Sequence, residues 1–146
     1  MSKVWAPIAA GLVVIGAAAA VVAVTRDSGT SYESPLTILE IMGDEGYRCP
    51  IEPQGMIILD EDKDTILCVP PSAPRGQATA IQTFADPAEV DADVRFARED
   101  VPPGDEDRSW IVGENWIVKL PRATASESEL RRLAEVLGGD VFVPGA

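Results

Sequence analysis

The sequence predicts an α+β fold, in which a transmembrane helix precedes a small domain of antiparallel β-hairpins with about three helices packed on one face of the sheet. Three observations predict it. An uncharged run of 21 residues occupies positions 4–24. Two pairs of short apolar runs are each separated by a turn sequence, which is the pattern of β-hairpins. Segments with helix-capping residues alternate with these pairs, as is typical of helices laid against an antiparallel sheet.

Residues 4–24 fit a bilayer span. At about 1.5 Å per residue the run would measure roughly 31 Å, close to the hydrocarbon thickness of a membrane. It has no polar face, and Gly11 and Gly16 would weaken a soluble helix. The run is longer than the apolar part of a usual cleavable signal peptide, although small residues near its end would suit cleavage. We therefore expect an uncleaved signal anchor over residues 1–26, and a secreted protein if the signal is cleaved.

The charges around this segment predict its orientation. Lys3 and the amino terminus lie on the short side, whereas all 24 acidic residues lie from Asp27 onward. The N-terminus is therefore expected in the cytoplasm and the domain outside, in a bacterial cell membrane that residues 4–24 cross once. Residues 27–146 carry 10 basic against 24 acidic residues, so this domain repels phosphate backbones. We expect the lipid bilayer as a partner and no nucleic acid.

Cys49 and Cys68 are the only two cysteines, and their spacing matches no metal or redox motif. The chain has no histidine, so a metal held by this pair would lack its usual further ligands. Disulfides persist outside the cytoplasm. We therefore expect a disulfide in preference to two free thiols, with a stabilisation of about 3 kcal/mol from closing the loop.

The first half of the domain begins with a predicted tether. Residues 27–34 are small and polar, which favours a flexible connection. Ser34 and Pro35 suit an N-cap and a first helical position, and they predict a short helix over residues 36–42 that Gly43 ends. The domain itself is expected to cover residues 35–146.

The central elements follow in order. Residues 55–59 and 65–69 are apolar runs around five charged and polar residues, which predicts a hairpin. Residues 78–84 are typical of a strand. Asp86 then provides an N-cap, with a proline and a glutamate at the positions that favour a helix over residues 87–99.

The last elements form a second hairpin and a final helix. Residues 110–112 and 116–120 are apolar runs on either side of a turn. Ser126 begins a capping box, and leucines at helical spacing predict a helix over residues 130–137 that a Gly-Gly pair ends. Residues 141–143 are expected to form an edge strand.

Several of these features together resemble a known group of proteins. They are the Cys pair around a hairpin, Phe84 before a helix start, the motif V-G-x-N-W-x-V at residues 112–118, and Leu-Gly-Gly at residues 137–139. In this order they are similar to small secreted, lipid-anchored or membrane-anchored actinobacterial proteins of unknown function. The resemblance covers roughly residues 36–143 and implies an outward-facing domain, but it implies no activity and no site residues. The chain departs from such proteins in lacking a lipobox cysteine, if lipid anchoring is common among them.

Asp60, Asp62 and Asp64 are the first candidate metal ligands, because they have the spacing of the first three side-chain ligands in a calcium loop. The sixth position of such a loop needs glycine but is Thr65, and the twelfth needs glutamate but is Pro71. We therefore interpret the three aspartates as the solvated tip of a hairpin, with weak calcium binding as the alternative.

Trp110 and Trp116 are candidates for an exposed aromatic binding surface, because they flank one hairpin. Residues of the same parity on paired strands more often pack into the core, and we favour that interpretation. Asn115, the only asparagine, suits the turn between them. The acidic residues 105–107 form a second loop that is no more specific for a cation than the first.

The residue inventory excludes most catalytic chemistry. Without histidine there is no Ser-His or Cys-His nucleophile, and no nucleophile-elbow, P-loop or dinucleotide motif occurs. We therefore expect no enzyme and no cofactor. The leading hypothesis is an accessory or protein-interaction domain with an unknown protein partner. The alternative is a small-ligand or weak cation-binding module that uses the acidic loops.

Overall fold

The computed structural model describes residues 29–51, 57–59, 63–73 and 77–145. Within these ranges no helix has the length and apolar character that crossing a membrane requires. The predicted signal anchor, with its span over residues 4–24, lies outside the described residues. Asp60 and Asp62 lie outside them as well.

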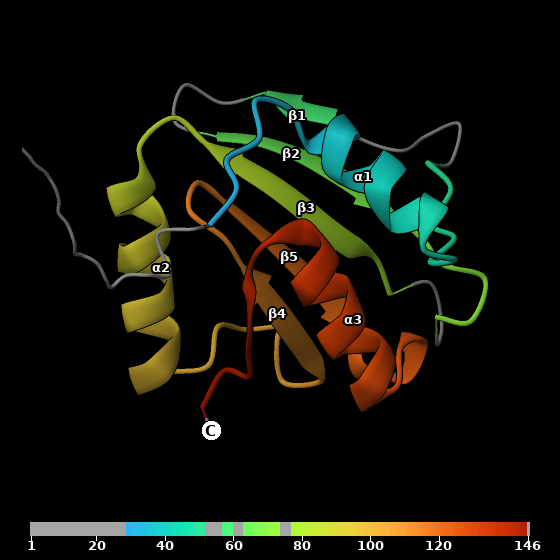
Figure 1. Cartoon of the computed structure of the whole chain (residues 1–146). Helices are drawn as coiled ribbons and strands as arrows, with labels where there is room; N and C mark the ends of the chain where they lie inside the picture. Colours follow the sequence, from blue (N-terminus) through green and yellow to red (C-terminus); the bar gives the residue numbers. More distant parts are fainter. Residues whose placement is uncertain (1–28, 52–56, 60–62, 74–76, 146) are drawn as a thin grey trace, which may run out of the picture.

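An antiparallel sheet of six strands forms the centre of the domain (Figure 1). The strands lie in the order β1-β2-β3-β5-β4-β6, and every neighbouring pair is antiparallel. Their bounds are β1 Ile57–Leu59, β2 Lys63–Cys68, β3 Thr79–Phe84, β4 Arg108–Val112, β5 Trp116–Pro121 and β6 Asp140–Phe142. The two predicted hairpins are therefore β1–β2 and β4–β5, and the predicted last edge strand is β6.

Three α-helices accompany the sheet, and each begins at a side-chain cap. They are α1 Pro35–Asp44, α2 Pro87–Glu99 and α3 Glu127–Leu137. Ser34 and Asp86 accept hydrogen bonds from the second backbone N–H of their helices, and Ser126 forms a full capping box with Glu129. The predicted α+β class is confirmed, and a short 3-10 helix, Arg122–Thr124, joins β5 to α3.

The helices cover both faces of the sheet, which corrects the prediction that they pack on one face. In β5, Trp116 and Val118 pack with α1 and α3, whereas the intervening Ile117 packs with Val90 and Ala97 of α2. Successive side chains of a strand point to opposite faces, so α2 lies on the face away from α1 and α3. Uninterrupted apolar runs in β4 and β5 are the sequence signal of this arrangement, because a strand buried on both faces has no polar side.

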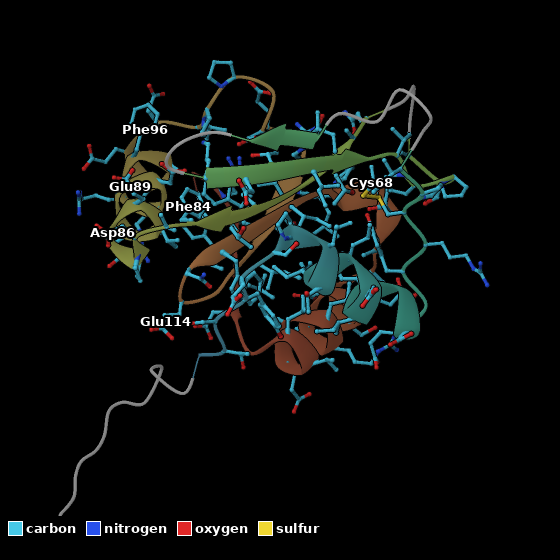
Figure 2. All side chains as sticks on the ribbon, turned by 90° about the horizontal axis from the view of Figure 1, so that it is seen from above. Cys68, Phe84, Asp86, Glu89, Phe96 and Glu114 are labelled. Carbon is cyan, nitrogen blue, oxygen red and sulfur yellow. A yellow bond between two sulfur atoms is a disulfide. The ribbon has the colours of Figure 1, made fainter. Side chains whose placement is uncertain are left out.

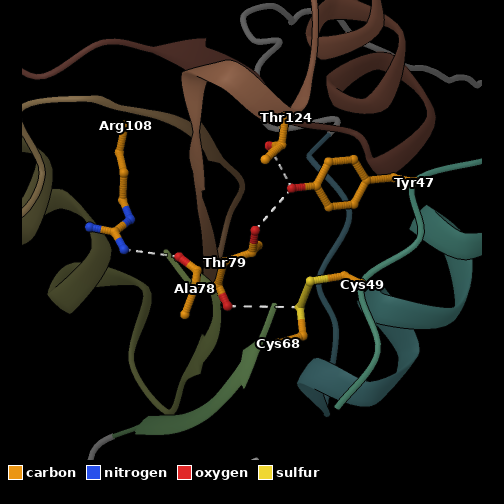
Figure 3. The surroundings of a disulfide bond; sticks show 7 residues. All are labelled: Tyr47, Cys49, Cys68, Ala78, Thr79, Arg108 and Thr124. Carbon is orange, nitrogen blue, oxygen red and sulfur yellow. Dashed lines mark hydrogen bonds between the residues drawn. A yellow bond between two sulfur atoms is a disulfide. The ribbon is translucent and has the colours of Figure 1, made fainter. Parts of the chain in front are cut away.

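A disulfide fastens the segment after α1 to the end of β2 (Figure 3). The bond joins Cys49 and Cys68, both buried, and confirms the predicted bridge. Beside it the Tyr47 hydroxyl lies 2.9 Å from the hydroxyl of Thr79 and 2.8 Å from that of Thr124. Burial raises the pKa of the Tyr47 phenol, so the hydroxyl stays protonated and able to donate. These contacts join the segment after α1 to the start of β3 at Thr79 and to the short 3-10 helix after β5 at Thr124.

Candidate functional site

The two tryptophans form no shared aromatic surface. Trp110 and Trp116 are 1% and 0% exposed, and they pack into the two different cores of the sheet. The register of the hairpin explains this, because Trp110 pairs with Lys119 and Val112 pairs with Ile117. Partners across this hairpin have residue numbers of opposite parity. Trp110 and Trp116 therefore lie on opposite faces of the sheet, and the interpretation that both pack into the core is confirmed.

The indole ring of Trp116 is seated against two glycines. A Cβ at Gly113 would lie 1.9 Å from the ring, and a Cβ at Gly139 would lie 2.8 Å from it. Any side chain at either position would enter space that the ring fills. The V-G-x-N-W and Leu-Gly-Gly motifs therefore share one physical role, which is to make room for Trp116.

Asn115 binds the backbone of Tyr32 with both atoms of its amide. Its Oδ1 accepts a hydrogen bond from the Tyr32 backbone N–H at 3.0 Å, and its Nδ2 donates to the Tyr32 carbonyl at 2.7 Å. One side chain thus satisfies a donor and an acceptor that a neighbouring strand would otherwise satisfy. The turn between β4 and β5 is thereby attached to the chain that precedes α1.

Three further contacts complete this attachment, which we call the N-terminal clasp (residues 30–32 with Asn115, Trp116 and Leu137). Trp116 Nε1 donates to the Thr30 carbonyl at 2.8 Å, and the Tyr32 hydroxyl donates to the Leu137 carbonyl at 2.9 Å. The rings of Tyr32 and Trp116 meet edge to face at 5.6 Å between centroids. Residues 30–32 were assigned to the flexible tether, and here they are held by the domain. Sequence reasoning gave Asn115 only a turn role, because its partners are backbone atoms that leave no pattern in the sequence.

The predicted acidic triad cannot be assembled from the described residues, since only Asp64 belongs to them. Asp64 lies within β2, where it pairs with Leu59 and Thr83. Strand β2 begins two residues earlier than the sequence predicts, which places Asp64 in the strand. Across the described ranges, no three His, Cys, Asp or Glu side chains gather closely enough to hold a metal ion.

In the second acidic loop, the carboxylate of Asp105 already forms ion pairs with basic side chains of the domain. Asp105 is buried, and its carboxylate lies 3.5 Å from Arg108 and 3.9 Å from Lys119. Lys119 Nζ also stands 4.4 Å from the centroid of the Trp110 ring, a cation–π distance. A metal ion at this loop would have to compete with two resident positive charges for the one buried carboxylate.

Burial lowers the pKa of the Lys119 ammonium, and the carboxylates of Asp105 and Asp93 oppose that shift. Three buried polar atoms on this side of the sheet have no hydrogen-bond partner in the described part of the chain. They are Trp110 Nε1, Arg108 Nε and Gln82 Oε1. Polar groups on this side of the sheet are therefore buried at a cost in free energy.

A hollow of about 340 Å³ lies between α2 and the edge strand β6, and we call it the α2–β6 groove. Val94, Val112, Val141 and Phe142 supply its apolar lining. Val94 and Phe142 are half-buried, so part of this lining is open to solvent. An apolar surface of this kind gains free energy when a partner covers it.

Four charged side chains share this lining: Asp91, Arg95, Arg98 and Asp140. The guanidinium of Arg98 lies 5.6 Å from the centroid of the Phe142 ring. Neither Arg95 nor Arg98 forms an ion pair with a described carboxylate, whereas Arg131 and Arg132 on α3 pair with Glu127 and Glu45. The groove therefore combines apolar surface with two guanidinium groups that no described carboxylate neutralises.

The first described residues of the chain, from residue 29, lie at the end of the domain where α2 lies. Figure 2 shows Glu114, Asp86 and Glu89 at one end of the domain and Cys68 near the other. Phe96 is 56% exposed on α2 but does not line the groove. Gly138 and Gly139, which border the N-terminal clasp, directly precede β6.

No protein-family model matches this chain, and neither does any curated protein or solved structure. The likeness to actinobacterial proteins, drawn from motifs such as that at residues 112–118, remains an expectation. The function is therefore inferred from the chemistry and geometry of the described residues.

Proposed function

We propose that this protein is a membrane-anchored accessory domain that lies outside the cytoplasm and binds another protein through the α2–β6 groove. The uncharged run at residues 4–24 supports the anchor, and the disulfide supports an oxidising compartment. The observation that carries the proposal is the groove itself. It joins open apolar surface to two arginines without carboxylate partners among the described residues.

The composition of the groove favours a protein partner. Arginine and aromatic residues are enriched in the centres of protein interfaces, where they contribute much of the binding free energy. Here Arg98 lies against the ring of Phe142, and the half-buried Val94 belongs to the same lining. The groove is bounded by a helix and a strand, so it would be largely preformed before a partner arrives.

The N-terminal clasp supports a partner near the membrane. The predicted span ends at residue 24, and the clasp begins at residue 30. An extended chain covers at most about 3.5 Å per residue, so these two positions stand no more than roughly 21 Å apart. The domain is therefore expected to stay near the bilayer, so we propose that its partner is a membrane protein or a domain close to the same membrane.

The alternative, a cation-binding module, receives no support from the second acidic loop. Asp105 is buried against Arg108 and Lys119, and these residues already neutralise its charge. The first acidic loop offers only Asp64 within the described residues, and that residue belongs to a strand. We therefore propose the interaction function alone.

Site-specific photo-crosslinking in the native membrane tests this function. A benzophenone amino acid in place of Asp91, an exposed residue of α2 in the groove lining, places the probe in the groove, and the same probe in place of Glu135, exposed on α3, serves as the control. We expect position 91 to give a discrete protein adduct that position 135 does not give, and the adduct to be identified by mass spectrometry. The same adducts from both positions, or none from position 91, would remove the groove as the binding surface.

A further inference from the structure

We infer that residues 30–33, which we call the strap, open away from the domain while the rest of the fold stays intact, so that the domain stands at two distances from its predicted anchor. The opening follows from the contacts of the N-terminal clasp alone. The two distances rest on the anchor of the proposed function. The α2–β6 groove takes no part in this inference.

The strap is held by side chains and not by a backbone ladder. Residues 30–33 belong to no helix or strand, and in the described part of the chain their backbone forms no hydrogen bond with another backbone group. The side chains of Asn115 and Trp116 bind this backbone instead. Breaking these bonds therefore separates no pair of strands in the sheet.

Most of the strap lies at the surface of the domain. Thr30, Ser31 and Glu33 are exposed, and Tyr32 is half-buried. The bond that the Ser31 hydroxyl donates to Glu114, at 3.0 Å, is exposed as well. Water replaces such bonds when they break, so each of them stabilises the closed strap only modestly. Segments with few buried apolar contacts and exposed hydrogen bonds are the ones that open first.

The closed strap is nevertheless one defined state. A Cβ at Gly138 would lie 2.6 Å from the Thr30 hydroxyl oxygen, so the strap is seated directly on this glycine. The Tyr32 ring meets Trp116 edge to face, and its hydroxyl donates to the Leu137 carbonyl. Because these contacts all belong to neighbouring residues of the strap, we expect them to form and break together.

The opening ends where α1 begins. Ser34 caps this helix, and Ile38 and Met42 on it are each 0% exposed. The disulfide between Cys49 and Cys68 fastens the segment that follows α1 to β2. A load that arrives along the chain therefore meets the clasp first, and it meets a helix buried in the core only afterwards.

Release of the strap lengthens the tether. With the strap closed, at most roughly 21 Å of extended chain joins residue 24, the end of the predicted span, to residue 30. With the strap open, the free chain runs to residue 34 and measures at most roughly 35 Å at about 3.5 Å per residue. The open strap thus lets the domain reach partners that stand farther from the membrane.

Amide hydrogen exchange of the full chain in lipid nanodiscs, followed by NMR, tests the opening. One reporter is the amide of Tyr32, which donates to Asn115 in the clasp, and the other is the amide of Val118 in the central strand β5. We expect both amides to be protected relative to an unfolded peptide. The Tyr32 amide should exchange at least about tenfold faster than the Val118 amide, because it opens locally.

Two tyrosine variants separate local from global opening. Tyr32→Phe removes the hydroxyl that binds the Leu137 carbonyl but keeps the ring and the backbone, so it should speed exchange at position 32 about fivefold and leave Val118 unchanged. Tyr47→Phe removes a buried hydroxyl outside the clasp, so it should speed exchange of Val118 and leave position 32 unchanged.

Three results of the exchange experiment would overturn the inference. A common rate for the two amides, moving together in both variants, would show that the clasp opens only with the whole domain. An unprotected Tyr32 amide would show that the strap is not held. No effect of Tyr32→Phe at position 32 would show that the contacts of the strap do not break together.

Energy transfer between a dye on Glu135→Cys and acceptor-labelled lipid headgroups tests the two distances. Asn115→Ala, which removes both bonds to the backbone of Tyr32, should lower the transfer, whereas Tyr47→Phe should not. Equal transfer with and without Asn115→Ala would overturn the two distances. Transfer absent from every chain would remove the anchor, and the proposed function and the two distances with it, while the exchange result would still decide whether the strap opens.

Discussion

The indole Nε1 of Trp116 donates a hydrogen bond to the backbone carbonyl of Thr30 at 2.8 Å. A ring buried in the core thus holds the chain just before α1. Asn115 adds two bonds to the backbone of Tyr32. Residues 30–32 are therefore held in place by the hairpin of β4 and β5.

Asn115→Asp should loosen the N-terminal clasp. The aspartate keeps an acceptor but loses the Nδ2 donor, so the Tyr32 carbonyl loses its 2.7 Å hydrogen bond. We expect a loss of about 1–2 kcal/mol in the free energy of unfolding. Faster proteolysis between residues 29 and 34 should accompany it. Glu135→Gln changes an exposed residue of α3 and should stay within about 0.5 kcal/mol of the unaltered chain. Equal protease resistance of the two variants would refute a clasp role for Asn115.

Gly113→Ala should destabilise the fold by overpacking. The new Cβ would lie 1.9 Å from the ring of Trp116, which is held in turn by Thr30 and Gly139. We expect a cost of about 1–3 kcal/mol, measured by urea denaturation. Gly43→Ala is the matched control, since nothing lies within 4 Å of its Cβ in α1, and it should stabilise by about 0.5–1 kcal/mol. A neutral Gly113→Ala would show that Trp116 does not depend on this close approach.

Removal of the disulfide should cost about 3 kcal/mol, because the bridge closes a loop between residues 19 positions apart. The Cys49→Ala, Cys68→Ala double variant measures this cost by denaturation. On intact cells, a membrane-impermeant maleimide should label the unaltered chain only after treatment with a reductant. Labelling without reductant would argue against the bridge in the cell, and no labelling under either condition would argue against an outward-facing domain.

The stability of the domain should increase as the pH rises toward 10. Burial holds the pKa of Lys119 below its ordinary value of 10.5, so the unfolded chain binds this proton more tightly than the folded chain does. Between the folded and the ordinary pKa, the unfolded state therefore carries more protons, and the free energy of unfolding rises with pH. Lys119→Met should flatten this rise while keeping an apolar side chain over Trp110. An equal slope in the two proteins would contradict the assignment to Lys119.

Tyr47 sets the upper limit of that pH window. Burial raises the pKa of its phenol above the ordinary value of 10.0, so the unfolded chain releases this proton first. The stability that Tyr47 contributes is therefore complete below pH 10 and is lost as the pH rises above it. Measurements for Lys119 are best confined to the range below pH 10.

Local signals in the sequence predicted most of the elements but not their assembly. Asp86 and Pro87 specify the start of α2 through a side-chain cap and a fixed φ, and these effects act within one turn of helix. The face that α2 covers depends on how the strands between distant segments pair, which no local signal encodes. The burial of both tryptophans was predicted from the sequence, but which of the two cores each one enters depends on the register of the hairpin.

The functional features were the hardest to predict from sequence. The N-terminal clasp binds backbone atoms of Thr30 and Tyr32, which every residue type provides, so only Asn115 and the glycines leave a signal. The α2–β6 groove joins residues from α2 with residues more than 40 positions later in the chain, and only the fold brings them together. The disulfide was easier to predict, because each of the two cysteines has only the other to pair with in a domain that is expected outside the cytoplasm.

The yield of the photo-crosslinked adduct from position Asp91, in the full chain within its native membrane, tests the central claim most directly. A groove that binds a neighbouring membrane protein predicts one dominant adduct at Asp91, strongly reduced at Glu135 and in the chain with Arg95→Gln and Arg98→Gln. An adduct pattern that is identical at Asp91 and Glu135, and unchanged by the arginine substitutions, would contradict it.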